Sequence, residues 1–155
     1  MIQFGMFEYS FLVWFVNAVL ALLSYVWSPP DGMLVALFPA LFFSLGMMSH
    51  FVRKDGIGLA QTWENSATWA KGIAVASILY TAVNFTVCMT LLGEGGPHIE
   101  NGVYCLWNHG FIREITAAEY KALRIVESRM FFGHLLAFSG MSVAFFSARK
   151  KICPL

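Results

Sequence analysis

The pattern of hydrophobic and polar positions divides this chain into four long apolar runs joined by polar stretches. The runs cover residues 9–27, 33–52, 72–92 and 130–148, and none contains Asp, Glu, Lys or Arg. A helix rises about 1.5 Å per residue, so about 20 residues cross the hydrocarbon core of a bilayer. A helix on the surface of a soluble domain would instead keep one polar face. The pattern therefore predicts four transmembrane helices.

The breaks between the runs predict how these helices are arranged. Ser28-Pro29-Pro30-Asp31-Gly32 separates the first two runs, because proline cannot continue a helix and glycine suits a turn. Glu8 stands where a signal peptide would carry positive charge, so we expect the first run to be retained as a helix. The fold class predicted is an all-α membrane protein, with residues 1–155 as one domain and four helices in an antiparallel bundle.

The longest polar stretch, residues 93–129, predicts a small structure outside the membrane. Two segments rich in β-branched and aromatic residues flank Asn108-His109-Gly110, a sequence typical of turns. We expect a β-hairpin over residues 102–116, in which Asn108 and Gly110 are residue types that tolerate positive φ angles. Thr116 and Glu119 then match a capping box, which predicts one long helix over residues 117–148.

Composition supports a membrane protein and excludes several functions. Hydrophobic residues make up 58% of the chain and charged residues 12%, and the mean hydropathy is +0.65. Soluble domains contain about 25% charged residues. The net charge of +1 provides no basic surface for nucleic acid. Cys88, Cys105 and Cys153 have no CxxC spacing, so we expect neither a zinc site nor a dithiol centre.

Two histidines in the apolar runs are candidate axial ligands for a haem group. A b-type haem needs two axial ligands at matched depth on facing helices. His50 lies near the inner end of the second run, whereas His134 lies near the outer end of the fourth. One subunit cannot bridge them, so we expect no cofactor and no bound metal.

The distribution of lysine and arginine predicts the orientation in the membrane. If both termini and the middle loop, which joins the second and third runs, are cytoplasmic, six of the ten positive residues lie inside and four lie outside. The cluster Arg149-Lys150-Lys151 directly follows the last run, where the positive-inside rule is most reliable. We therefore expect a multi-pass protein of a bacterial inner membrane, with cytoplasmic termini and a periplasmic hairpin.

Polar residues recur at helical spacing within the runs. Lipid provides no hydrophobic drive between helices, so helices associate there through close packing and interhelical hydrogen bonds. We expect an intramembrane polar layer made of Asn17, Thr81, Asn84, His134 and Ser139. This layer is interpreted as structural, with a substrate or proton path as the alternative.

Small residues form a second pattern in the last run. They recur on one helical face, where they let a neighbouring backbone approach closely. We expect this helix-packing seam to consist of Gly133, Ala137, Gly140 and Ala144.

The stretch from the predicted turn into the last helix carries a resemblance. Asn108-His109-Gly110, Ile115-Thr116 and Glu119-Tyr120, followed by Arg129 and Gly133-His134, resemble small four-span bacterial inner-membrane proteins of unassigned function. The likeness covers about 35 residues and carries no known activity with it. It implies a bacterial origin.

The function class that the sequence favours is a non-enzymatic membrane protein that binds another protein. Aromatic side chains on an exposed segment are typical binding anchors. The expected contact residues are Tyr104, Trp107, His109 and Phe111. Both an immunity protein that engages a membrane-acting toxin and an accessory subunit of a membrane complex fit this prediction.

Two other classes stay open. The first is a lipid- or quinone-linked membrane enzyme, although no catalytic motif in the chain defines an activity. The second is a small transporter or channel that forms by oligomerisation through Gly133 and Gly140. The partners expected overall are the lipid bilayer and either another protein or a second copy of this chain, and nucleic acid is not expected.

Overall fold

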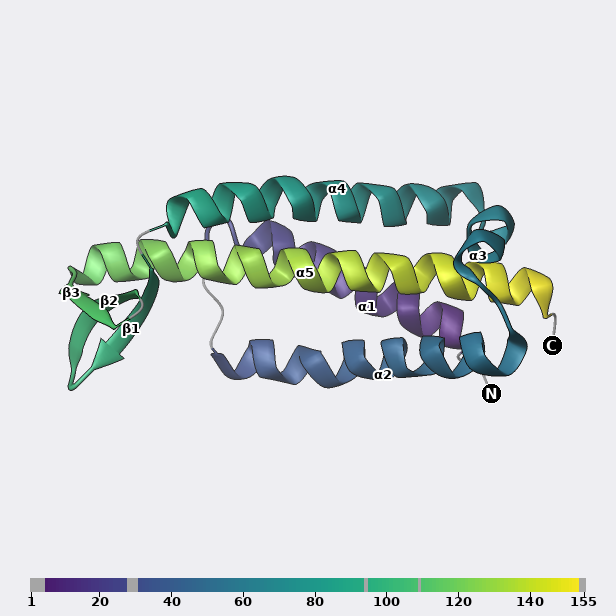
Figure 1. The fold of residues 1–155 in the computed structure, drawn as a ribbon, viewed down its shortest axis with the longest axis horizontal. Helices are drawn as coiled ribbons and strands as arrows, with labels where there is room; N and C mark the ends of the chain where they lie inside the picture. Colours follow the sequence, from purple (N-terminus) through teal and green to yellow (C-terminus); the bar gives the residue numbers. More distant parts are fainter. Residues whose placement is uncertain (1–4, 28–30, 94, 109, 154–155) are drawn as a thin grey trace.

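The computed structural model describes residues 5–27, 31–93, 95–108 and 110–153, which form five helices and three strands (Figure 1). The helices are α1 (Met6–Leu23), α2 (Asp31–Asp55), α3 (Leu59–Asn65), α4 (Thr68–Leu91) and α5 (Ala117–Ile152). The strands are β1 (Gly96–Glu100), β2 (Val103–Asn108) and β3 (Phe111–Glu114). The protein is mostly helical, with one small antiparallel sheet.

The longest helix, α5, is the centre of the bundle. It contacts the other four helices as well as strands β1 and β2. Successive long helices run in opposite directions, so the two chain ends lie together at one end of the bundle and the sheet lies at the other (Figure 1). The antiparallel order agrees with the sequence prediction.

Three helices, not four, are long and apolar enough to span a membrane within the described part of the chain. They are Met6–Leu23, Thr68–Leu91 and Ala117–Ile152. Helix α2 is not among them. The side chains of its first six residues, 31–36, lie outside the described part of the chain. Three of the four predicted spans are therefore present within the described residues as helices long and apolar enough to cross a membrane.

The helix boundaries also differ from the predicted ones. Helix α1 ends at Leu23, so Tyr25 and Trp27 follow the helix instead of forming its last turn. Helix α2 begins at Asp31, inside the predicted turn, of which residues 28–30 lie outside the described residues. The separate helix α3 occupies the middle loop, and α4 then begins at Thr68.

The start of α5 confirms the predicted capping box. The Glu119 amide donates to Thr116 Oγ1 at 3.2 Å, and the Thr116 amide donates to Glu119 Oε2 at 2.8 Å. These bonds satisfy donors that the first turn of a helix leaves unpaired. Helix α5 has 36 residues, and its charged first turns extend beyond the end of α4 and carry the sheet (Figure 1).

The polar segment before α5 folds as three strands instead of the predicted two. The additional strand, β1, pairs with β2 through a turn at Asn101 and Gly102, whose φ angles are 51° and 82°. A two-residue Asn-Gly turn suits the right-handed twist of paired strands, because both of its residues take positive φ. The predicted hairpin therefore makes up two of the three strands of a larger sheet.

The predicted hairpin itself is formed by β2 and β3. Asn108 is the last residue of β2 and pairs with Phe111, so Asn108 is not a turn residue with positive φ. Gly110 has the expected positive φ, at 92°. The middle residue of the predicted turn, His109, lies outside the described residues.

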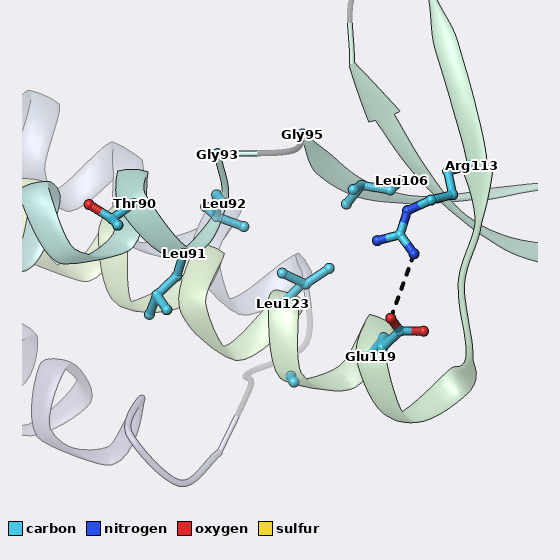
Figure 2. Close-up of a pocket in the computed structure, with 10 residues that line it drawn as sticks. Thr90, Leu91, Leu92, Gly93, Gly95, Leu106, Arg113, Glu119 and Leu123 are labelled. Atoms are coloured by element: carbon cyan, nitrogen blue, oxygen red, sulfur yellow. Dashed lines mark ion pairs between the residues drawn. The ribbon is translucent and has the colours of Figure 1, made fainter.

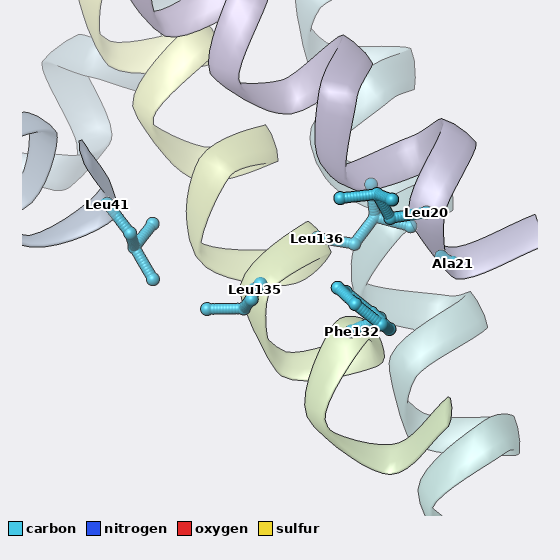
Figure 3. Close-up of a cluster of buried hydrophobic side chains, with 6 residues drawn as sticks. All are labelled: Leu20, Ala21, Leu41, Phe132, Leu135 and Leu136. Atoms are coloured by element: carbon cyan, nitrogen blue, oxygen red, sulfur yellow. The ribbon is translucent and has the colours of Figure 1, made fainter. Parts of the chain in front are cut away.

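Buried apolar side chains join α5 to the helices on either side of it. In Figure 3, Leu20 and Ala21 of α1 face Leu136 of α5, while Leu135 points toward Leu41 of α2. A second cluster near the chain ends contains Ile57, Phe145 and Phe146. Because both faces of α5 are covered, it is the most buried of the three candidate spans.

Candidate functional site

Three residues of the predicted polar layer, Asn17, Thr81 and Ser139, join α5 to its neighbours. Asn17 Nδ2 of α1 donates to Ser139 Oγ of α5 at 3.4 Å, and Thr81 Oγ1 of α4 donates to the Gly133 carbonyl oxygen at 2.5 Å. Asn17 is 2% exposed, and its Oδ1 has no hydrogen-bond partner in the described part of the chain. These contacts connect helices that lie far apart in sequence.

The other two residues of the predicted layer behave differently from each other. Asn84 Nδ2 donates to the Arg129 carbonyl oxygen at 2.8 Å, and Arg129 Nη2 donates to Asn84 Oδ1 at 3.3 Å. His134 Nδ1 lies 2.8 Å from the Met130 carbonyl on its own helix, and its ring packs edge-on against Phe85. Asn84 therefore links two helices, whereas His134 joins none of the other predicted layer residues.

The seam of small residues packs against helices of the same chain. A Cβ added at Gly133 would lie 3.1 Å from Asn84 Nδ2, and one added at Gly140 would lie 2.7 Å from Ser77 Oγ. Ala144 is buried and its carbonyl accepts a 2.8 Å hydrogen bond from Ser66 Oγ, while Ala137 is half-buried. Since α4 already covers both glycines, the seam does not provide the interface between copies that a channel formed through it requires.

The predicted partner-binding residues do not share one face of the sheet. The Tyr104 ring lies 4.8 Å from the Tyr120 ring of α5, so Tyr104 faces the helix. Trp107, an odd number of positions further along β2, points to the opposite face and is 55% exposed. His109 and the side chain of Phe111 lie outside what the structure describes.

The outward face of the sheet carries residues that sequence reasoning missed. Strand register places Glu100 beside Val103 and Glu114 beside Cys105, on the face that Trp107 shares. Val103 is exposed like Trp107, so an apolar row along β2 lies between two carboxylates. The Asn-Gly pair at positions 101 and 102 is the signal that would have revealed this arrangement.

A pocket of about 320 Å³ lies beneath the other face of the sheet. The end of α4, the sheet and the first turns of α5 enclose it, and Figure 2 shows Arg113 reaching from the sheet toward Glu119. Their charged groups lie 3.7 Å apart, with Leu106 and Leu123 also lining the pocket. This ion pair fastens the sheet to the start of α5, and both of its side chains stay about half exposed.

The charged groups in this pocket form a structural contact and not a catalytic pair. The Thr116 backbone amide and hydroxyl donate hydrogen bonds to the Glu119 carboxylate and lower its pKa, and Arg113 lowers it further. A carboxyl group with a lowered pKa stays ionised at neutral pH and is a poor general acid. Within the described residues, no group of three or more His, Cys, Asp or Glu side chains is placed to hold a metal ion.

Comparison of the chain with protein-family models, with curated proteins and with solved structures gives no match.

Proposed function

We propose that this chain is a multi-pass membrane protein whose sheet binds another protein at the membrane surface. Large apolar side chains remain exposed along the sides of three helices, among them Phe15 of α1, Phe42 of α2 and Val83 of α4. Exposed apolar surface of this extent is unfavourable in water and is the expected surface in lipid. We include α2 among the spans, because Phe42 and Phe43 present the same kind of surface.

The proposed orientation follows the positive charge at one end of the bundle. Arg149, Lys150 and Lys151 end α5, and the two chain ends lie together there (Figure 1). Arg149 Nε donates to Asp55 Oδ2 at 2.7 Å, and Lys150 Nζ donates to Glu8 Oε1 at 3.0 Å. These two ion pairs join α5 to α2 and α1 at this end of the bundle. We place it in the cytoplasm of a bacterium and the sheet in the periplasm.

The outward face of the sheet carries the proposed function. Its apolar row, Val103 and Trp107, is anchored to a rigid helix, so little ordering is needed when a partner binds. Glu100 and Glu114 lie on either side of this row. The fitting partner is therefore a protein segment that presents apolar side chains together with Lys or Arg.

Photo-crosslinking in cells tests this proposal. A photoreactive residue at Val103 should capture one protein, and Trp107→Ala should reduce the yield at least about tenfold, because a central tryptophan anchor is worth about 2 kcal/mol or more. Trp63→Ala is the matched control, since Trp63 is 51% exposed but lies in α3 at the other end of the bundle. The captured peptide should contain Lys or Arg when sequenced.

Two outcomes would contradict the proposal. One is a crosslinking yield that stays the same in Trp107→Ala, and the other is a yield that falls equally in Trp63→Ala. The identity of the captured protein separates the two roles that we consider. A membrane-acting toxin indicates an immunity protein, and a subunit of a membrane complex indicates an accessory role.

A further inference from the structure

A second cavity of about 320 Å³ opens where α1 ends, between α4 and α5. It is separate from the sheet pocket and shares no residue with the proposed partner face. Its polar lining consists of Tyr25, Tyr80, Asn84 and Arg129. Its apolar lining consists of Leu79, Val83 and Val87, which form one exposed stripe along α4.

The cation in this cavity is held in place but is not neutralised. The Arg129 guanidinium lies over the Tyr25 ring, 4.1 Å from its centroid, and Nη2 donates to Asn84 Oδ1 at 3.3 Å. None of the ion pairs between described residues includes Arg129, and the nearby Glu127 pairs with Arg124. The cavity therefore has a net positive charge.

Two donors in the cavity lack an acceptor. Arg129 Nε and the Tyr80 hydroxyl are both buried and have no partner within hydrogen-bond distance in the described part of the chain, although the Tyr25 side chain lies close enough to Tyr80 to interact with it. Buried donors are normally satisfied, so an unsatisfied pair lining one cavity points to a group that is bound there. That group must present oxygen acceptors and negative charge.

The apolar stripe indicates what is attached to the charged group. Leu79 and Val83 are 61% and 66% exposed, and they lie about two turns and one turn, respectively, from the end of the cavity at Val87. A hydrocarbon chain lying along this stripe would extend into the bilayer as its head group enters the cavity. A free anion would leave the stripe uncovered.

We propose that this cavity binds the phosphodiester group of an acidic phospholipid, with an acyl chain along α4. The phosphate oxygens accept hydrogen bonds from Arg129 Nε and from the Tyr80 hydroxyl, and Asn84 and Tyr25 fix the guanidinium. This proposal rests on the membrane part of the proposed function, and it does not depend on the partner-binding face.

Lipid retention by the purified full-length chain tests the proposal. The protein in mild detergent is mixed with phosphatidylglycerol, phosphatidylcholine or inorganic phosphate, and native mass spectrometry measures the bound species. We expect selective retention of phosphatidylglycerol. Tyr80→Phe removes one hydroxyl and should weaken retention about tenfold, because a hydrogen bond to a charged group is worth about 1.5–3 kcal/mol.

Two further variants separate a specific site from general effects. Arg129→Lys keeps the positive charge but removes the Nε donor and the planar stack on Tyr25, so it should also weaken retention. Tyr9→Phe is the matched control, since Tyr9 donates to the Ala40 carbonyl, away from this cavity, and should retain phosphatidylglycerol like the unmodified chain.

Each contrary outcome has a defined meaning. Equal retention of the two lipids, or unchanged retention in Tyr80→Phe, overturns the proposal, and binding of inorganic phosphate alone overturns the lipid assignment. If lipid selectivity fails while Trp107-dependent crosslinking persists, the proposed function stands without this site. If the chain does not insert into membranes, the proposed function falls as well.

Discussion

At the scale of single residues, small and polar side chains decide how closely α4 approaches α5. Gly140 has no side chain at the point where Ser77 meets it, and the Trp14 indole donates to that Ser77 hydroxyl at 3.0 Å. Three helices therefore meet at one serine. Such contacts matter in lipid, where the attraction between helices comes from packing and hydrogen bonds.

Replacing Gly140 tests this packing. In Gly140→Ala the new Cβ would lie 2.7 Å from Ser77 Oγ and 2.9 Å from Ser77 Cβ, so one helix must shift. We expect a loss of about 1–3 kcal/mol in the free energy of unfolding, measured by titrating the detergent-solubilised protein with a denaturing detergent.

Gly46→Ala is the control for that experiment. Gly46 lies inside α2 and an added Cβ there meets no atom within 4 Å. This variant should be as stable as the unmodified chain or gain about 0.5–1 kcal/mol, because alanine favours helix more than glycine does. An equal free energy of unfolding in the two variants would contradict close packing of α4 against α5 at Gly140.

At the scale of elements, the sheet depends on a turn and on the helix that carries it. A three-stranded sheet of this size has little core of its own, and β1 and β2 both contact α5. Leu106 and Ile115 are buried beneath it, and the Ile115 amide donates to the Tyr104 carbonyl at 2.9 Å. The capped start of α5 thus positions the proposed partner face.

The turn between β1 and β2 provides a test at this scale. Gly102 has φ of 82°, a conformation that costs a residue with a side chain about 1–2 kcal/mol. In Gly102→Ala we expect faster cleavage of this hairpin by protease and a lower crosslinking yield at Val103. Gly96→Ala is the control, because Gly96 lies in β1 at ordinary φ and an added Cβ meets nothing. Equal cleavage of the two variants would contradict this role.

At the scale of the whole molecule, α5 ties the proposed external face to the opposite end of the bundle. The sheet lies at its first turns, and the Arg149 contact with Asp55 lies near its last turn. The arrangement predicts that the sheet and the chain ends lie on opposite sides of a membrane, whichever side each one takes (Figure 1).

Labelling with a membrane-impermeant maleimide tests both the separation and the orientation. Cys88 and Cys105 are buried, so Cys153 should be the main reactive native thiol among the described residues. We expect Cys153 to react only after cells are permeabilised, whereas Ile99→Cys should react in intact cells, because Ile99 is exposed on β1. Reaction of both thiols from one side would contradict a membrane-spanning bundle, and the reverse pattern would invert the orientation.

The sequence by itself determined the features that depend on local interactions. The long helices, the capped start of α5 at Thr116 and the positive φ of Gly110 follow from apolar run length, from hydrogen bonds between near neighbours and from the steric freedom of glycine. The strand β1 belonged to this class too, since Asn101-Gly102 is a local signal, but the prediction overlooked it.

Only the tertiary structure decided which surfaces meet. Helical spacing shows that Gly133 and Gly140 share a face, but not that α4 covers that face instead of a second copy of the chain. It likewise does not show that Arg129 reaches Asn84, a residue 45 positions away. Such contacts depend on how side chains from distant segments fit together in space, and spacing along one helix carries no information about the helix that faces it.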